Sequence, residues 1–360
     1  MTVYSPATTA VGIIGSGSYL PNEIVPNSVV AELAGVTAEW IVRKTGIRER
    51  HRAAPHEATS DLATAAARAA MHDAGIHARD VAWVIVATST PDYPQPATAC
   101  LVQNQIGATR AAAFDINAVC AGFVFALQTG AQLLAGISED TDAKYALVIG
   151  ADVYSRILDH SDRKTAVLFG DGAGAVVLGP TRPGFGIVGT GTSTDGSLHD
   201  LIGVQAGGSR HPASAGTLAD GQHFFRMRGR EVRDFVNERL PAAVQGVLAA
   251  HGVDPAEVKH FVPHQANGVM VGEVIPHLGL PNAHAHLPVD LHGNTGAASI
   301  PLALDHANRS GALRDGDLVL LAGFGGGMGV GTALVRWDAT PPRHPAGPSH
   351  SAQLVGSVAR

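Results

Sequence analysis

The chain has very few cysteines: among its 360 residues only Cys100 and Cys120 carry a thiol. Two thiols cannot form the disulfide framework of a small secreted protein, so a reducing, cytoplasmic location is expected. No signal peptide is expected either, because the opening apolar stretch 11–14 is short and Pro21 follows closely. The sequence also lacks any run near the roughly 18 apolar residues that cross a bilayer, which argues against a membrane protein.

An excess of positive charge is missing as well. The chain has 25 Lys and Arg against 31 Asp and Glu, a formal net charge of -6, so no nucleic-acid partner is expected. Its 18 histidines, among them His284, His286 and His292, invite a metal hypothesis. They do not recur at the spacing of a ligand set, so we expect no metal site.

Aromatic residues make up only 5% of the chain, whereas glycine occurs 43 times, so tight turns and close backbone packing are expected. Apolar runs of strand length alternate with helical stretches such as 61–74. Because these runs show no polar alternation, they are typical of strands buried on both faces and predict a layered α/β protein. The runs are 81–87, 145–150, 173–178 and 318–323.

The chain repeats itself. The segments "DAGIHARDVAWVIVATS" and "AHGVDPAEVKHFVPHQA" share one pattern of helix end, glycine, turn and strand, and they align on Gly75 and Gly252 with an offset of 177. The glycine-rich segments "GDGAGAVVLG" and "GGGMGVGTALV" also resemble each other. We therefore predict two related halves, 1–180 and 181–338, packed around a pseudo-twofold axis.

The repeat indicates where chemistry could lie. Ligands of open α/β sheets bind beyond the carboxyl ends of the strands, and Cys120, His264 and Asn294 are expected at such ends. A cysteine in one half and a histidine in the other could form a single composite site. The same alignment pairs these three residues with Ala297, Ala87 and Asn117.

Each of the three residues also has a purely structural interpretation. Cys120 could be a buried thiol that acts as a small hydrophobe, and His264 and Asn294 could be hydrogen-bonding turn residues. A reactive thiolate needs a helix N-terminus or a cation nearby. Cys120 follows the expected strand 114–117 and opens the small-residue helix 121–127, so first-turn N–H groups can stabilise its thiolate. Taken together, the three positions favour catalysis.

These residues carry a family resemblance. The segments "DINAVCAGF", "VPHQAN", "HGNTGAASIPLAL" and "FGGGMGVGTAL" resemble the cysteine, histidine, asparagine and glycine-rich motifs of β-ketoacyl-acyl-carrier-protein synthase III, a family of the thiolase superfamily. The segments "EWIVRKTGIRER" and "FGDGAGA" resemble it too. The similarity covers about residues 11–337, with the motifs in order.

The resemblance implies a homodimer of subunits with a duplicated, five-layered αβαβα thiolase-like fold. It implies acylation of Cys120 by an acyl-coenzyme A, followed by decarboxylative condensation with malonyl-carrier protein, without a resident cofactor. His264 and Asn294 would stabilise the enolate. The backbone N–H groups of Cys120 and Gly326 would form the oxyanion hole.

The resemblance also implies contacts to coenzyme A. Trp40 and Arg156 would sandwich the adenine, Lys44 would lie near the phosphates, and Asn267 would contact the pantetheine arm. Trp40 could instead be a core aromatic residue. The arginines of "RMRGREVR" would form a landing site for an acidic carrier protein or bind the ligand's phosphates, or they are simply a solvated helix start; those assigned to docking are Arg226, Arg228 and Arg230.

Several positions depart from the commonest pattern of the family. Gly268 and Val269 follow "HQAN", where a docking arginine is usual, and Gln95 stands in the loop expected to floor the partner's acyl pocket. These changes leave the Cys-His-Asn set intact but affect the substrate and carrier. The remaining departures are Arg230 for a channel asparagine, Gly296 for a serine, and Met328-Gly329 for an aromatic pair.

Three functions follow in order of preference. Decarboxylative condensation, in a fatty-acid or polyketide pathway, comes first because a simple acyltransferase has less need of Asn294. Acyl transfer to a hydroxyl or amine without condensation comes second. A non-catalytic partner subunit is third, since it predicts a degraded site. The Pro-, Ser- and His-rich tail 339–360 is expected to be disordered.

Overall fold

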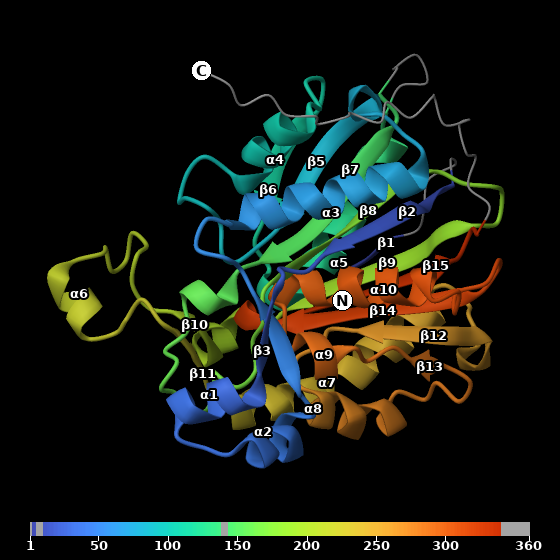
Figure 1. Cartoon of the computed structure of the whole chain (residues 1–360). Helices are drawn as coiled ribbons and strands as arrows, with labels where there is room; N and C mark the ends of the chain where they lie inside the picture. Colours follow the sequence, from blue (N-terminus) through green and yellow to red (C-terminus); the bar gives the residue numbers. More distant parts are fainter. Residues whose placement is uncertain (1, 5–9, 138–142, 340–360) are drawn as a thin grey trace, which may run out of the picture.

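The computed structural model describes residues 2–4, 10–137 and 143–339, which form two stacked sheets and the helices around them (Figure 1). The first sheet has the order β2-β8-β7-β5-β6, with parallel pairs in β7-β5-β6 and antiparallel pairs in β2-β8-β7. Its strands are β2 (Val11–Tyr19), β8 (Gly172–Pro180), β7 (Tyr145–Asp152), β5 (Val81–Ala87) and β6 (Ala112–Ile116).

The second sheet has the related order β1-β9-β15-β14-β12-β13. Strand β12 lies parallel to β13 and β14, whereas β14, β15, β9 and β1 are joined by antiparallel pairs. The strands are β1 (Thr2–Tyr4), β9 (Gly186–Thr194), β15 (Gly329–Arg336), β14 (Leu318–Gly325), β12 (Val258–Pro263) and β13 (His284–Ala285).

Helices complete a five-layered αβαβα arrangement. Helices α5 and α10 lie between the two sheets, α3 covers the outer face of the first sheet, and α7 covers the outer face of the second (Figure 1). The apolar runs of the strands are therefore covered on both faces, which explains why they show no polar alternation. The layer helices are α3 (Thr59–Ala74), α4 (Thr98–Ile106), α5 (Gly122–Ala135), α7 (Gly229–Ala250), α8 (Gly268–Val274) and α10 (Ser299–Arg309).

Smaller elements gather at one side of the two sheets (Figure 1). The hairpins β3-β4 and β10-β11 are separate two-stranded sheets, and α2 contacts α8. These elements are β3 (Glu23–Pro26), α1 (Asn27–Ala34), α2 (Ala38–Thr45), β4 (Glu49–Arg52), β10 (Ile202–Val204), α6 (Ala215–Ala219), β11 (Phe225–Met227) and α9 (Val289–His292). The 3₁₀ helices are η1 (Ala78–Asp80), η2 (Val119–Ala121), η3 (Tyr154–Arg156), η4 (Gly196–Leu201), η5 (Pro255–Glu257), η6 (Ile275–His277), η7 (Gly296–Ala298) and η8 (Gly326–Met328).

The offset of 177 seen in the sequence also exists in the backbone. It superposes η1 on η5 and η2 on η7 residue by residue. Gly75 and Gly252 both end a helix with positive φ, 67° and 63°. Val119 and Gly296, which open η2 and η7, have φ of 48° and 58°. The two halves thus share an unusual turn, although one has a β-branched residue where the other has glycine.

The sheets divide the chain between Pro180 and Gly186, close to the expected boundary of the halves 1–180 and 181–338. Strand β1 is the exception, because it pairs with β9 and so joins the second sheet. A short antiparallel strand can pair with the edge of a sheet from anywhere in the chain, and the sequence repeat does not predict it. The tail expected to be disordered lies, from residue 340 onward, outside the described residues.

Candidate active site

Cys120 lies in η2, in a sharp turn between strand β6 and helix α5. Val119 has a φ of 48°, a conformation that is strained for a β-branched residue. Gly325 at the end of β14 approaches so closely that a Cβ there would lie 2.8 Å from both the Cβ and the backbone nitrogen of Cys120. The nucleophile candidate is therefore held between the start of one helix and the end of a strand from the other half.

The environment of the thiol opposes ionisation. Cys120 is buried, and burial, with a further contribution from the charge of Asp152, raises the pKa of its thiol to about 12. A hydrogen bond from Tyr154 acts in the opposite direction. The thiol is thus neutral at rest, and the short η2–α5 junction alone does not make it a thiolate.

His264 follows β12, and its backbone N–H donates to the carbonyl of Ala322 on the neighbouring β14 at 2.8 Å. The ring packs edge-to-face on Phe324 with centroids 5.1 Å apart. Burial lowers the pKa of His264 to about 3, so the imidazole is neutral at physiological pH. Within the described part of the chain its Nδ1 has no hydrogen-bond partner. A neutral imidazole can donate one N–H to a ligand.

Asn294 belongs to the second half but is held by the first. Its backbone N–H donates to Leu168 at 2.8 Å, and its carbonyl accepts from Gly170 at 3.0 Å. The side-chain Oδ1 accepts from the N–H of Gly296 at 2.9 Å. Because Oδ1 is occupied, the amide NH₂ is the end that can donate to a ligand.

The three residues converge at the carboxyl end of β14. The turn containing Cys120 contacts β14 and the η7 turn that follows Asn294, and His264 is hydrogen-bonded to β14. The structure therefore brings together the cysteine, histidine and asparagine that the repeat placed at strand ends.

A cavity of about 830 Å³ opens beside this point. Trp40 and Lys44 from α2, Asn267 at the start of α8, and Asn294 all line it. Of the arginines assigned to docking, Arg228 and Arg230 also line this cavity. Further lining residues include Thr45, Arg163, Lys164, Leu168, Met227, Arg233, Val269 and Met270.

The assignment of Arg156 to the adenine remains a prediction that the cavity does not support. Arg156 is not among the residues lining this cavity, because its guanidinium turns toward the segment before α3 and donates to the carbonyls of Ala54 at 2.8 Å and Glu57 at 3.2 Å. Arg163 shares the cavity wall with Trp40 instead. Sequence reasoning missed Arg163, although it shortly precedes the "FGDGAGA" segment, which could have drawn attention to it.

The remaining predicted residues either lie off the cavity or already have acidic partners. Arg226 lies off the cavity and pairs with Asp159 at 3.2 Å and Asp162 at 3.6 Å, and Arg228 pairs with Asp200 at 2.9 Å. Ion pairs with neighbouring carboxylates reduce the positive charge available for docking. Gln95 lies in the exposed loop between β5 and α4.

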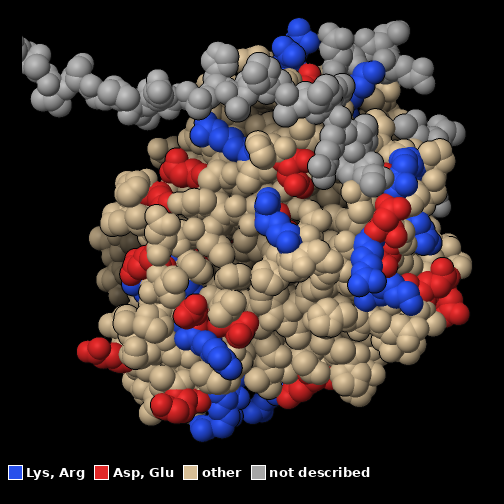
Figure 2. Space-filling view, turned by 45° about the vertical axis from the view of Figure 1, so that its right-hand side comes forward, with Lys and Arg blue, Asp and Glu red and all other residues tan. Residues whose placement is uncertain are grey.

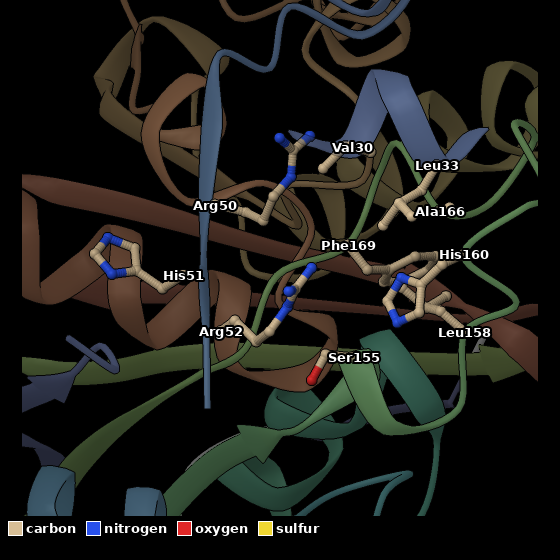
Figure 3. A pocket seen from close by; sticks show the side chains of 10 residues that line it. All are labelled: Val30, Leu33, Arg50, His51, Arg52, Ser155, Leu158, His160, Ala166 and Phe169. Carbon is tan, nitrogen blue, oxygen red and sulfur yellow. The ribbon is translucent and has the colours of Figure 1, made fainter. Parts of the chain in front are cut away.

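A second cavity lies near β4 (Figure 3). Arg50, His51 and Arg52 come from β4, and Ser155 and His160 come from the segment after β7. Its volume of about 10 Å³ has room for roughly one water molecule. It is too small for a thioester, so the larger cavity is the candidate substrate site.

The surface agrees with the mild net charge. On the face shown in Figure 2, acidic and basic side chains are interspersed and no broad patch of one sign appears. Within the described ranges, no helix is both long and apolar enough to cross a membrane. The same ranges contain no group of three or more His, Cys, Asp or Glu side chains able to hold a metal ion.

The duplicated five-layered fold, with a cysteine at one turn and a histidine and an asparagine from the other half, defines a thiolase-like protein. Residues 114–196 match the family model of 3-oxoacyl-[acyl-carrier-protein] synthase III, and residues 248–337 match the model of its C-terminal part. 3-Oxoacyl and β-ketoacyl are two names for the same group.

The relatives agree with the family models. The chain is 57% identical to acetoacetyl CoA synthase NphT7 of Streptomyces sp. (strain CL190) over 327 residues, 90% of this chain and 98% of that one. It is 47% identical to the β-ketoacyl-[acyl-carrier-protein] synthase III of Rhodospirillum centenum (strain ATCC 51521 / SW), with 90% and 98% covered. The chain therefore belongs to the β-ketoacyl-acyl-carrier-protein synthase III family.

Solved structures give the same result. The structure of 3-oxoacyl-(acyl carrier protein) synthase III from Pseudomonas aeruginosa PAO1 matches with a TM-score of 0.82 at 37% identity, over 92% of this chain and all of that one. The priming β-ketosynthase from the R1128 polyketide biosynthetic pathway matches with a TM-score of 0.84 at 31% identity, over 94% and 99%. The chain is thus a condensing enzyme of this type, and these relatives give no support to acyl transfer without condensation.

Proposed function

We propose that the chain moves an acyl group from coenzyme A to Cys120 and then condenses it with a malonyl thioester, releasing CO₂. One observation carries this proposal: a single cavity joins Trp40, Lys44 and Asn267 to Asn294. An aromatic ring, a cation and an amide along one wall suit the adenine, phosphates and pantetheine arm of a coenzyme A thioester. Neither step needs a resident cofactor.

In the first step Cys120 gives up its thiol proton and its sulfur attacks the acyl thioester, and coenzyme A leaves and takes up one proton in return. The backbone N–H groups of Cys120 and Gly326 would donate to the developing oxyanion, and each such donor contributes about 3–4 kcal/mol to transition-state stabilisation. The close approach of Gly325 to Cys120 supports this pairing, since it brings the start of η8 beside the nucleophile.

In the second step malonyl thioester loses CO₂, and its thioester oxygen gains negative charge as the enolate forms. Neutral His264 and the amide of Asn294 would donate to that oxygen. The burial that holds the pKa of His264 at about 3 supports this role, because the neutral ring has one N–H to donate and lacks the acidic second proton of an imidazolium. The enolate carbon then attacks the acyl group on Cys120.

The malonyl donor is proposed to be an acyl carrier protein. Arg230 on the cavity wall would meet the phosphate or an acidic side chain of the carrier, with weaker contributions from Arg226 and Arg228, which already have acidic partners.

A specific observation favours malonyl-coenzyme A as a second candidate. Val269, which stands where the family usually has a docking arginine, lines the cavity and is 39% exposed. A relative at 57% identity is named acetoacetyl CoA synthase, and acetoacetyl-coenzyme A is a β-ketoacyl thioester of coenzyme A rather than of a carrier protein. An apolar residue at the mouth favours a free thioester over a charged protein surface.

The working protein is proposed to be a cytoplasmic homodimer. Gln95 and its exposed loop would then enter the partner's acyl pocket and limit the length of the primer. This expectation is tested by comparing primer length preference in Gln95→Ala with that of the native chain, and by measuring molar mass through light scattering.

The proposed reaction is tested with purified protein and acetyl-coenzyme A, given malonyl-carrier protein in one series and malonyl-coenzyme A in another. We expect CO₂ and a β-ketoacyl product to appear together, and both to disappear in Cys120→Ala. Product in the coenzyme A series alone would replace the carrier protein with malonyl-coenzyme A. Acylation of Cys120 without CO₂ in either series would contradict both.

A further inference from the structure

Arg50, the last residue of the segment "TGIRER", is a buried cation to which the proposed reaction gives no role. It lies in β4, beside the small cavity near that strand, and is 3% exposed (Figure 3). Its Nη1 donates to Oδ1 of Asn27 at 2.7 Å and to the carbonyl of Val25 at 3.4 Å, and its Nη2 donates to the carbonyl of Val167 at 2.9 Å. One guanidinium thus ties the junction of β3 and α1 to a stretch of chain more than a hundred residues away.

The guanidinium remains charged where it lies. Burial lowers the pKa of Arg50 to about 10, with a further contribution from the charge of Arg52, so the group is still protonated at neutral pH. Its hydrogen bonds within the described part of the chain all go to neutral oxygens. Burying such a cation is costly unless its donors are used. The observed contacts therefore point to a role in holding backbone.

The backbone that Arg50 holds is also the backbone that fixes Asn294. Val167 opens the stretch 167–170, whose next carbonyl, that of Leu168, accepts from the N–H of Asn294 at 2.8 Å. The N–H of Gly170 donates to the carbonyl of Asn294 at 3.0 Å, and residues 169 and 294 form an isolated parallel bridge. The carbonyl bound by Arg50 and the carbonyl that binds Asn294 thus belong to adjacent residues.

The same place is packed without spare room. A Cβ added at Gly170 would lie 2.9 Å from the Cβ of Arg50 and would overlap the carbonyl of His292. A Cβ added at Gly293 would lie 3.4 Å from the Cβ of Arg50. The stem of Arg50 therefore lies against both the stretch 167–170 and the turn that leads into Asn294.

We propose that Arg50 is a positioning residue, which holds the stretch 167–170 so that the amide of Asn294 faces the enolate oxygen of the second step. Without the guanidinium, the carbonyl of Val167 loses this donor, and the stretch can shift together with Asn294. A displacement of about 1 Å can slow a reaction by about 10²-fold. Cys120 is restrained by Gly325 instead, so the first step should not depend on Arg50. The inference rests on the role of Asn294 in the proposed function.

The test measures the two steps separately in single turnovers. The first readout is the burst of coenzyme A from saturating acetyl-coenzyme A. The second is CO₂ release when the acetylated protein receives malonyl-carrier protein or, in a parallel series, malonyl-coenzyme A.

Two variants of Arg50 and one control are compared. Arg50→Met removes the guanidinium and keeps an apolar chain in its place. Arg50→Lys keeps the charge but offers one nitrogen where the guanidinium uses two. Arg309→Met is the matched control, because Arg309 at the end of α10 also joins two segments, through Asp305 and the carbonyl of Ser16.

We expect CO₂ release to slow by about 10–10²-fold in both Arg50 variants, while the coenzyme A burst stays within about twofold of native. Both rates should stay native in Arg309→Met. Asn294→Ala alone should slow CO₂ release by roughly 10²–10³-fold, the effect of losing one oxyanion donor. Adding Arg50→Met to Asn294→Ala should slow it by less than about threefold more, because no amide is left to misplace.

The outcomes separate positioning from packing and from charge. Native CO₂ release in Arg50→Met, equal slowing of both steps, or losses that multiply in the double variant would mean that Arg50 only packs. Native CO₂ release in Arg50→Lys would assign the effect to charge rather than to position. Native CO₂ release in Asn294→Ala would instead overturn the proposed role of Asn294 itself. Circular dichroism identifies a variant that has failed to fold, and Arg50→Lys carries the test if Arg50→Met has not folded.

Discussion

At the scale of single residues, burial determines what each group can do. The same desolvation that keeps His264 neutral, and therefore a good N–H donor, keeps the Cys120 thiol protonated. Burial thus favours the proposed hydrogen-bond donation by His264 and opposes the ionisation of Cys120.

Replacing His264 with Ala should lower the rate of CO₂ release by roughly 10²–10³-fold, the effect of losing one oxyanion donor. With the native chain, no step due to His264 should appear between pH 5 and pH 8, because its pKa lies near 3. CO₂ release measured across this range checks both statements. His72→Ala, on the outer helix α3, is the control and should be silent; a bell-shaped profile that His264→Ala abolishes would contradict the neutral donor.

The two candidate adenine-contacting arginines give a matched pair. Arg163→Ala should raise KM for acetyl-coenzyme A severalfold with little change in kcat, because it removes binding made before the chemical step. Arg156→Ala should leave KM unchanged, since its guanidinium is engaged with Ala54 and Glu57. Steady-state kinetics of both variants test this expectation. A raised KM in Arg156→Ala and an unchanged KM in Arg163→Ala would support the assignment of Arg156 made from the sequence.

At the scale of elements, the site depends on how closely the end of β14 approaches η2. Glycine at position 325 permits this approach without any unusual backbone angle, since its φ of 177° is ordinary extended backbone. Space, rather than conformation, requires the missing side chain. The restraint acts on backbone atoms of Cys120, which cannot rotate away.

Gly325→Ala should therefore lower the free energy of unfolding by about 1–3 kcal/mol, the range for overpacking a core, and slow acylation of Cys120 at least tenfold. Gly272→Ala is the matched control, because nothing lies within 4 Å of a Cβ there and the residue is inside α8. That change should be neutral or stabilising by up to about 1 kcal/mol. Urea unfolding and a coenzyme A burst measure the two effects; native values for Gly325→Ala would show that β14 can move aside.

Sequence reasoning succeeded with elements that repeat and failed with side-chain direction. The offset between Gly75 and Gly252 predicted two turns whose backbones do match, because helix-ending glycines leave a pattern in the sequence. It could not tell that Arg156 turns toward Ala54. That direction is set by a loop distant in the chain, and no local pattern records it. The contact of Tyr154 with Ser89 was missed for the same reason, since the two residues follow different strands, β7 and β5.

At the scale of the whole molecule, each half holds residues that the other half needs. Asn294 is fixed by the backbone of Leu168 and Gly170, and Cys120 is fixed by Gly325. Neither half carries the complete Cys-His-Asn set. The interface between the halves is therefore part of the active site rather than a simple packing surface.

Acid should destabilise the molecule through its buried histidines. Burial lowers the pKa of His264 to about 3 and those of His286 and His292 to about 4. The unfolded chain binds protons at these residues below about pH 6.5, while the folded chain remains neutral there, so stability falls as pH drops from about 6.5 toward 4. A deeply buried histidine contributes a slope of up to about 1.4 kcal/mol per pH unit.

Urea unfolding of the native chain and of His292→Gln, at pH 7.5 and pH 5, checks this expectation. The free energy of unfolding should fall less with acid in the variant, because one of the contributing groups is gone. Equal slopes in the two chains would show that His292 titrates normally in the folded protein.

The middle layer limits which substitutions the chain can tolerate during evolution. Helix α5 has a sheet on each side: Gly130 on one face packs against Val148, and Val124 on the other faces Gly331. A larger side chain at either face has no solvent to move into, so it survives only if a residue on the neighbouring strand shrinks. Among descendants of this chain, positions 124 and 331, and positions 130 and 148, should therefore covary, and laboratory evolution should reach new side chains there through paired rather than single replacements.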